Sequence, residues 1–296
     1  MTLKSFAAAF LAVCGAVIAA TVALYRPATV PVPGPADDLV AYGQTLVTRT
    51  FAEIGPETQK PYAGNNLACQ NCHLDAGTKR SAVPLIGVAK TYPKFSERSG
   101  RDITLAERID ECMTRSMNGK SLPGDSREMA AFLAYIRSLD GPEAVQWPPA
   151  PVAEAPPDAT RGTEVYGRVC ATCHQLHGLG KRVGMGYEFP PLWGPDSFND
   201  GAGMHRLISS ANYIRANMPL GVRYDAPALS VEDAWDVAAF INSQPRPARA
   251  NRDLDYPDRS KKPVDAPFPP FADSFPLEEH RLGPFKPILA AQKKTP

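Results

Sequence analysis

The sequence predicts a mostly α-helical protein in which two similar domains follow one another along the chain. Apolar residues recur at helical spacing in several segments, whereas no segment of useful length alternates apolar and polar residues as a half-buried strand does. Two pentads with the pattern Cys-x-x-Cys-His stand at corresponding places in the two halves. Proline-rich stretches separate these halves from each other and from the C-terminal region.

The composition limits the classes of protein that the chain can belong to. Its 296 residues include 32 Lys and Arg against 31 Asp and Glu, so the net charge is +1 and gives no electrostatic case for nucleic-acid binding. A hydrophobic content of 44% excludes wholesale disorder. The 31 prolines predict many irregular connections. Six cysteines are too few for a disulfide scaffold of this length.

Residues 1–25 form a predicted export segment. Lys4 precedes an uncharged run over residues 5–25, which is about long enough to span a bilayer as a helix. A retained membrane anchor and a cleaved signal peptide both remain open, and a lipid anchor on Cys14 is a third reading. All three place the rest of the chain outside the cytoplasm, so we expect it in the periplasm. Residues 26–37 then form a stiff proline-rich spacer.

The folded part divides into two predicted domains and a tail. The first domain covers residues 38–141, a linker covers 142–157, the second domain covers 158–244 and a proline-rich tail covers 245–296. Each domain opens with a predicted helix, near residues 39–46 and 163–170, and closes with an amphipathic helix. The apolar positions of the closing helices are Met129, Phe132, Leu133 and Ile136 in the first, and Val231, Trp235, Ala238 and Ile241 in the second, where Ser230 is placed to cap.

Two forms of the tail remain open. Phe268, Phe271 and Phe275 would allow it to wrap around the body, and partial disorder is the alternative. Three histidines outside the pentads, at positions 177, 205 and 280, are expected at the surface.

The two pentads predict covalent attachment of two haem c groups, each carrying one iron. They consist of Cys69, Cys72 and His73, and of Cys170, Cys173 and His174. Two thiols at this spacing match the two vinyl groups of a haem, and the following His reaches the iron. A thioredoxin-like site would need a βαβ context that is missing, and a Cys₄ zinc site would leave both histidines unexplained.

In the second domain Met218 is the favoured sixth ligand of the iron. It lies 44 residues after His174, in a turn-rich loop that Pro219 stiffens, whereas Met185 lies too soon after His174 to cross the haem. The alternative is that Met218 belongs to the core and Met204 or His205 binds the iron. His/Met ligation raises the reduction potential, which suits a haem from which electrons leave.

In the first domain the residues alone leave the sixth ligand open. A capping box of Thr104 and Glu107 predicts a helix that starts at residue 105 and carries the candidates Cys112, Met113 and Met117. Met117 has the spacing of Met218, since it lies 44 residues after His73. Cys112 is the one cysteine after the leader that stands outside a pentad, and it is either a ligand or a small buried hydrophobe.

The helix that carries Cys112 is also rich in polar residues. Arg108, Cys112 and Ser116 fall on one face, and basic residues surround Cys112 in the sequence. Such arginines either bind oxyanions through paired hydrogen bonds or form a solvated surface in which Arg108 pairs with Glu107 or Glu111. The basic residues are Arg98, Arg108, Arg115 and Lys120.

Two segments of the chain resemble the dihaem thiosulfate dehydrogenases. They are residues 108–120 (RIDECMTRSMNGK) and residues 217–221 (NMPLG), and the similarity extends over about residues 38–244. The resemblance implies two mitochondrial-cytochrome-c-like domains, with haem 1 as the active site and haem 2 as the electron exit. It assigns His73 and Cys112 to haem 1, His174 and Met218 to haem 2, and active-site positions to Arg98, Arg108 and Ser116.

The chain departs from the family beside the haem 2 methionine. Some members have Lys at this position and exchange ligands on reduction, but here the residue is Asn217. Ligand exchange is therefore not carried over to this chain.

The resulting hypothesis is an enzyme that couples two thiosulfate ions to tetrathionate and passes two electrons to a small exported cytochrome c or iron–sulfur protein. Arg98, Arg108 and Lys120 would offset the repulsion between the anions, Ser116 would donate a hydrogen bond, and Cys112 would hold one thiosulfate covalently. The direction of the reaction stays open. One alternative is a dihaem electron carrier without a substrate, which predicts Met117 as the haem 1 ligand. Another is a sulfur-oxidation cytochrome subunit that conjugates thiosulfate to a carrier protein.

Overall fold

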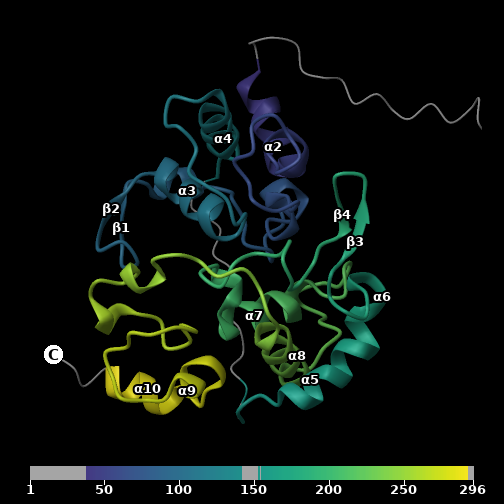
Figure 1. The fold of residues 1–296 in the computed structure, drawn as a ribbon, viewed down its shortest axis with the longest axis vertical. Coiled ribbons are helices and arrows are strands. Elements are labelled where there is room, and N and C mark those ends of the chain that lie inside the picture. Colours follow the sequence, from purple (N-terminus) through teal and green to yellow (C-terminus); the bar gives the residue numbers. More distant parts are fainter. Residues whose placement is uncertain (1–37, 142–152, 154, 293–296) are drawn as a thin grey trace, which may run out of the picture. The chain divides into compact units, whose positions relative to one another are not determined.

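The computed structural model of the protein describes residues 38–141, 153 and 155–292 (Figure 1). The predicted leader over 1–25, the spacer over 26–37 and most of the linker over 142–157 lie outside the described residues. Among the helices of the described part, none has the length and apolar character needed to cross a membrane.

The described chain is mostly helical, as the sequence predicts, and its few strands pair as two short antiparallel hairpins. The first domain contains α2 (Leu39–Glu53), β1 (Lys94–Ser96), β2 (Arg101–Ile103), α3 (Leu105–Arg115) and α4 (Arg127–Ser138). The second contains α5 (Ala159–Val165), a π-helical turn (Tyr166–Cys170), α6 (Ala171–His174), β3 (Lys181–Val183), β4 (Gly186–Phe189), α7 (Leu207–Asn217) and α8 (Val231–Ser243). The tail contains α9 (Leu277–Leu282) and α10 (Phe285–Gln292), and short 3-10 turns occur throughout, at Cys69–Asn71, Asp75–Gly77, Val88–Thr91, Gly203–His205, Arg252–Leu254 and Arg259–Lys261.

The first domain is built on the crossing of its opening helix α2 with its closing helix α4 (Figure 1). Gly43 lies at the crossing, and a Cβ atom there would stand 2.1 Å from the carbonyl oxygen of Ala131. Glycine is therefore required for the two backbones to approach this closely. Leu46 of α2 and Phe132 of α4 are buried beside it in one apolar core. Ser126 caps α4 by accepting a hydrogen bond from the Met129 N–H at 3.1 Å.

The second domain repeats this arrangement with α5 and α8. Gly162 takes the place of Gly43, since a Cβ atom there would lie 2.1 Å from the carbonyl oxygen of Asp236. Ser230 caps α8 by accepting from the Asp233 N–H at 3.0 Å, which confirms the predicted start of this helix. The helix that begins at Ala159 continues through the π-helical turn to the second cysteine pair.

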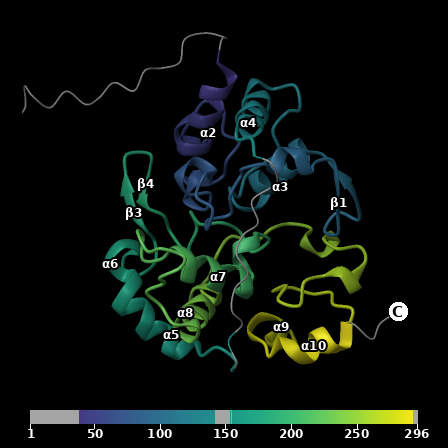
Figure 2. The same ribbon diagram turned by 180° about the vertical axis from the view of Figure 1, so that it is seen from behind.

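The tail is folded and packs on the body. Phe268 is buried, and the ring of Phe285 lies 6.0 Å from that of Trp235 in α8. The Arg206 Nε–H donates to the buried carboxylate of Asp265 at 2.7 Å, which ties the tail to the start of α7. Figure 2 shows this segment from behind, with α9 and α10 near its end.

Two of the histidines expected at the surface are not there, whereas His177 is exposed. His280 is only 1% exposed because its ring stacks on Phe271 and both ring nitrogens have hydrogen-bond partners in the tail. His205 is half-buried, and its two ring nitrogens contact the carbonyl oxygens of Asp200 and Asn242. Desolvation lowers the pKa of His205 to about 3, so it is neutral.

Amide side chains connect the two domains. The Asn65 Nδ2–H donates to the carbonyl oxygens of Ser116 and Ser197 at 3.0 and 3.2 Å, so it joins the end of α3 to the second domain. Asn217 is fully buried at the end of α7 and donates to the carbonyl oxygen of Ser81 at 2.9 Å. The Ser81 hydroxyl donates back to the Asn217 Oδ1 at 2.9 Å. The two halves are therefore tied together beside the segments that carry the predicted ligands.

Candidate active site

The first pentad lies against an apolar cavity of about 270 Å³ that suits a covalently held haem. Cys69, Cys72 and His73 line it together with apolar side chains from α3 and α4. The His73 Nδ1 lies 2.5 Å from the carbonyl oxygen of Val83. A carbonyl at this position fixes the proton on Nδ1 and leaves Nε2 as the ligand atom, which is the usual arrangement for a metal-binding histidine. The residues present therefore fit haem attachment and proximal ligation.

Cys112 lies where α3 borders this cavity, beside both His73 and Arg108. The Arg108 Nη1–H donates to the Cys112 Sγ at 3.3 Å. Burial alone would raise the pKa of the Cys112 thiol, but the Arg108 charge and the contact with the His73 ring lower it to about 7. The thiolate is thus accessible near neutral pH, and it lies close to the histidine that would hold the iron from the other side.

The alternative ligands Met113 and Met117 belong to the apolar core. They are 1% and 3% exposed, and both line the same cavity. Cys112 instead contacts the His73 ring and accepts a hydrogen bond from Arg108. The geometry therefore favours Cys112 as the residue that faces His73.

A second, polar cavity of about 210 Å³ meets the haem 1 cavity at Cys112. Five residues line both spaces. The polar cavity is rich in cations: four Lys or Arg residues line it against one acid, Glu111. The shared residues are Tyr92, Lys94, Arg108, Cys112 and Ser116, and the polar cavity adds Ser96, Arg98, Ile103, Glu111, Arg115 and Gly203.

The structure brings most of the predicted site residues together. Arg98, Arg108 and Ser116 line the cationic cavity with Cys112. Lys120 does not line it: this exposed lysine lies over the ring of Tyr62, with 5.4 Å from its Nζ to the ring centroid.

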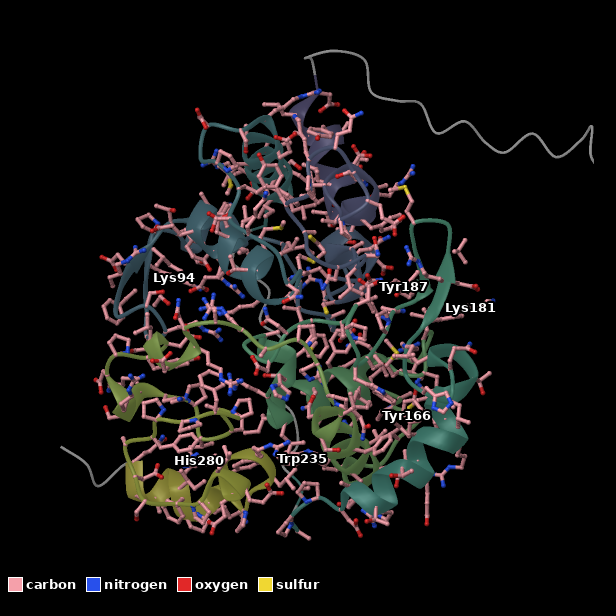
Figure 3. All side chains as sticks on the ribbon, viewed as in Figure 1. Lys94, Tyr166, Lys181, Tyr187, Trp235 and His280 are labelled. Atoms are coloured by element: carbon pink, nitrogen blue, oxygen red, sulfur yellow. The ribbon has the colours of Figure 1, made fainter. Side chains whose placement is uncertain are left out.

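Sequence reasoning missed Lys94 and left Arg115 without a role. Lys94 reaches the cavity from β1, where Figure 3 labels it, and its Nζ lies 4.7 Å from the Tyr92 ring centroid. The dense run of basic residues between positions 90 and 101 was a usable signal for Lys94. Arg115 follows Cys112 by three residues, which places it near the same helix face.

The second pentad lies against another apolar cavity, of about 200 Å³. The His174 Nδ1 lies 2.8 Å from the carbonyl oxygen of Pro190, so this histidine too is oriented to bind iron through Nε2. Met218 and Met204 both line the cavity, whereas Met185 lies outside it. His205, the other alternative ligand, has both ring nitrogens engaged by backbone carbonyl groups.

The two haem cavities share a wall. Residues from both domains line both spaces, so the two haem sites are adjacent and separated by single side chains. The Tyr213 hydroxyl donates to the carbonyl oxygen of Asn71 at 3.1 Å across this wall. The shared lining residues are Leu67, Asn71, Cys72, Phe198 and Met204.

Comparison with protein families gives one match for each half of the chain. Residues 58–140 match the family described as the SoxA/TsdA cytochrome c domain. Residues 157–241 match the family described as cytochrome C oxidase, cbb3-type, subunit III. The two halves are cytochrome c domains in tandem, and with the fit of the two pentads this shows two covalently bound c-type haems.

Curated relatives match most of the described chain. A thiosulfate dehydrogenase of Allochromatium vinosum is 38% identical over 262 residues, which cover 83% of this chain and 94% of the relative. A thiosulfate dehydrogenase of Stutzerimonas stutzeri is 41% identical over 217 residues, which cover 70% of this chain and 69% of the relative.

A solved structure shows the same fold. It is the thiosulfate dehydrogenase TsdBA from Marichromatium purpuratum in its as-isolated form, with a TM-score of 0.65 and 36% identity. The match covers 74% of this chain and 48% of the solved chain, so this chain spans about half the length of that structure.

Proposed function

Because the chain belongs to the thiosulfate dehydrogenase family, we propose that it oxidises two thiosulfate ions to one tetrathionate ion beside Cys112. The observation that carries this proposal is the position of the Cys112 thiol, which lies at the meeting of the haem 1 cavity and the cationic cavity. A sulfur nucleophile and several cations thus lie at the edge of the cavity that would hold the haem 1 iron.

The two haems, when bound, supply one-electron acceptors for the two electrons that the reaction releases. Cys69, Cys72 and His73 would hold the first, and Cys170, Cys173 and His174 would hold the second. We assign Cys112 as the sixth ligand of haem 1 and Met218 as that of haem 2. The support is that the Cys112 thiol contacts the His73 ring, and that Met218 lines the cavity of His174 together with the adjacent Pro219 and Leu220.

The cations of the cavity can offset the electrostatic repulsion between two thiosulfate ions. Two dianions about 5 Å apart repel each other by about 13 kcal/mol at an effective dielectric constant of about 20. Attraction to the four cations that line the cavity is of the same order, so the cavity can hold both anions at once. Ser116 adds a hydroxyl donor on the same wall.

The chemistry at Cys112 balances in two steps. The Cys112 thiolate forms an S–S bond with the terminal sulfur of the first thiosulfate, and two electrons leave. The second thiosulfate then attacks that same sulfur through its own terminal sulfur, which forms the central bond of tetrathionate and releases the Cys112 thiolate. No proton is taken up or released in either step. Arg108 stabilises the thiolate as nucleophile and as leaving group by the hydrogen bond at 3.3 Å.

The environment of the reaction follows from the same proposal. We place the folded part in the periplasm, with electrons passing from haem 2 to a small cytochrome c or iron–sulfur protein. Residues 5–25 then serve as a signal peptide or as a membrane anchor, and these residues lie outside the described part.

The test is steady-state reduction of ferricyanide by the purified, haem-loaded protein with thiosulfate as the sole donor. The proposal predicts turnover with one tetrathionate formed for every two thiosulfates consumed, without any added carrier protein. Absence of turnover in protein that contains both haems would contradict it. Turnover that requires a thiol-bearing carrier protein would favour the thiosulfate-conjugating alternative.

A further inference from the structure

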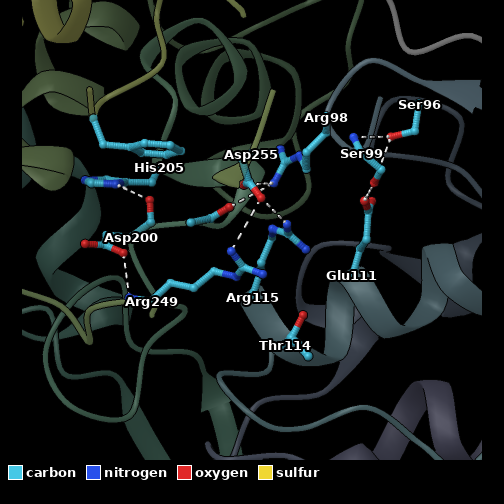
Figure 4. A network of polar contacts seen from close by, with 12 residues as sticks. Ser96, Arg98, Ser99, Glu111, Thr114, Arg115, Asp200, His205, Arg249 and Asp255 are labelled. Atoms are coloured by element: carbon cyan, nitrogen blue, oxygen red, sulfur yellow. Dashed lines mark hydrogen bonds and ion pairs between the residues drawn. The ribbon is translucent and has the colours of Figure 1, made fainter. Parts of the chain in front are cut away.

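A carboxylate from the C-terminal tail enters the cluster of arginines behind the cationic cavity. The Asp255 Oδ1 accepts from the Arg115 Nη2–H at 2.7 Å, and the Asp255 Oδ2 lies 3.5 Å from the Arg98 Nη1. Arg249 approaches the Oδ1 at 3.5 Å. Figure 4 shows the three guanidinium groups converging on this single carboxylate. Asp255 is 140 residues away from Arg115 along the chain, so the tail supplies it to a site that the first domain builds.

The tail is also hydrogen-bonded to the backbone at Arg98. The Tyr256 N–H donates to the carbonyl oxygen of Arg98 at 2.8 Å, and the Arg98 guanidinium lies over the Tyr256 ring, 5.5 Å from its centroid. Pro257 fills the space beside Gly100, because a Cβ atom on Gly100 would stand 2.5 Å from the proline ring. The hairpin loop between β1 and β2 and the tail segment around Asp255 are therefore fitted to each other.

The positive charge of the arginines in this cluster exceeds the negative charge of Asp255. One carboxylate faces three guanidinium groups, and burial together with the nearby Arg98 lowers the pKa of Arg115. The Arg115 side chain is only 8% exposed. Among the described residues, its buried Nε–H has no hydrogen-bond partner. A buried donor without a partner is energetically unfavourable. Both Arg98 and Arg115 line the cationic cavity, so an anion there lies beside their excess positive charge.

The cluster is separate from the cation at Cys112. Arg108 interacts with the Cys112 thiol, with Glu111 and with the hydroxyl group of Tyr92. Arg98 and Arg115 instead pair with Asp255 and repel each other, and Arg98 also donates to the carbonyl oxygen of Gly201 at 3.2 Å. The arginines that line the cavity therefore fall into two groups, Arg108 at the Cys112 sulfur and Arg98 with Arg115 at Asp255.

We propose that Arg98 and Arg115 form a second oxyanion subsite, and that Asp255 is the positioning residue that holds their guanidinium groups at the cavity wall. The ligand is a divalent sulfur oxyanion, which in turnover is the second thiosulfate. The proposal rests on the proposed function for the identity of that anion. It makes the tail part of the substrate site, although no tail residue lines the cavity.

Neutralising Asp255 changes anion binding in opposite directions for the two roles that this residue could have, which are positioning the arginines and reducing their charge. If Asp255 only reduced the positive charge of the cavity, its neutralisation would strengthen anion binding. If it holds two arginines in place, its neutralisation loosens them and weakens anion binding. The isosteric variant D255N therefore decides between the two.

The tail offers a matched control in Asp265. This carboxylate is fully buried and, like Asp255, pairs with an arginine, but its partner Arg206 is not among the residues that line any of the three cavities. Both D255N and D265N remove a buried carboxylate charge from the tail, and only D255N touches the proposed subsite. Haem content and thermal midpoint are recorded for both variants.

Two measurements on full-length, haem-loaded protein test the proposal: the KM for thiosulfate, and the Kd of sulfate for the oxidised protein by calorimetry. For D255N we expect both constants to rise at least tenfold while kcat changes less than threefold, and for D265N both to stay within twofold. Unchanged or lower constants in D255N, or equal increases in D265N, would overturn the proposal. If D255N does not accumulate, D255E is measured in the same way, with an expected rise of at least threefold; unchanged constants there also overturn it.

The sulfate measurement separates this inference from the proposed function. If the wild-type protein shows no thiosulfate turnover, but sulfate binds and D255N weakens that binding, the function is wrong and the subsite stands. If turnover is normal and D255N changes neither constant, the function stands and the subsite is wrong.

Discussion

The two haem domains share a framework but differ in what surrounds the sixth-ligand side of the haem. In both, a glycine on the opening helix allows the closing helix to cross at a carbonyl oxygen, with Gly43 in one and Gly162 in the other. In both, a backbone carbonyl orients the proximal histidine. The first domain adds a cysteine and a cationic cavity, whereas no described Lys or Arg lines the haem cavity of the second.

In the proposed function, this difference corresponds to two tasks, substrate binding and electron transfer. A cavity with more cations than acids is unfavourable unless it binds anions, so the proposed function assigns substrate binding to the first domain. An apolar cavity with a methionine suits a haem that only accepts and passes electrons at raised potential. The adjacent cavities allow both tasks to be joined through a shared wall.

The largest effect is expected from removing the thiol that distinguishes the first domain. C112A should lower kcat for thiosulfate oxidation by about a thousandfold or more, because no nucleophile remains to carry the first thiosulfate. Steady-state ferricyanide reduction measures this. M117L is the matched control, since Met117 lines the same cavity, and it should keep at least half of the activity. Comparable losses in both variants would remove the special role of Cys112.

The next effect concerns the cation at the reacting sulfur. R108Q should lower kcat/KM for thiosulfate by about 10- to 150-fold, because a hydrogen bond to a charged group contributes about 1.5–3 kcal/mol. The matched control is R168Q, because the exposed Arg168 of the second domain pairs with Asp233 and lines none of the three cavities. A value for R108Q within twofold of wild type would mean that Arg108 is only surface charge.

The second domain should respond differently to loss of its ligand. M218L should leave the KM for thiosulfate within about twofold while lowering the potential of haem 2 and reducing kcat by about tenfold, because the loss of methionine ligation removes the driving force for electron exit. Redox titration followed by absorbance measures the potential. M204L is the control, since Met204 lines both haem cavities. A change of potential in M204L but not in M218L would exchange their roles.

Because the two domains share the glycine at their helix crossing, we expect substitution of either glycine to lower the stability by a similar amount. G43A and G162A should each lower the free energy of unfolding by about 1–3 kcal/mol, because the added Cβ atom overlaps a backbone carbonyl oxygen in the helix crossing. Denaturant unfolding measures this. G124A and G167A are the controls, because a Cβ atom there meets nothing within 4 Å. A large loss in only one of the two domains would show that the crossings are not equivalent.

The sequence predicts the elements whose signals are local. The capping box of Thr104 and Glu107 starts α3 as expected, and both closing helices occur where their apolar spacing places them. The spacing of Arg108, Cys112 and Ser116 predicts a shared helix face, and all three line one cavity.

The remaining features depend on contacts that are distant in sequence. Asp255 joins the arginine cluster from the tail, and nothing in its neighbourhood marks it as a partner of Arg115. Lys120 follows the helix closely in sequence, but the chain turns after α3 and carries it to Tyr62. His280 is buried because the tail folds back on itself, which a proline-rich composition does not predict.

The most direct test of the contrast between the domains is electron paramagnetic resonance of the oxidised, haem-loaded protein. Wild type should show two low-spin ferric centres, one with the signature of His/thiolate ligation and one of His/Met ligation. The thiolate signal should disappear in C112A and persist in M117L, while the His/Met signal disappears only in M218L. A thiolate signal that survives in C112A, or two His/Met centres in the wild type, would contradict the assignment of haem 1 as the substrate site.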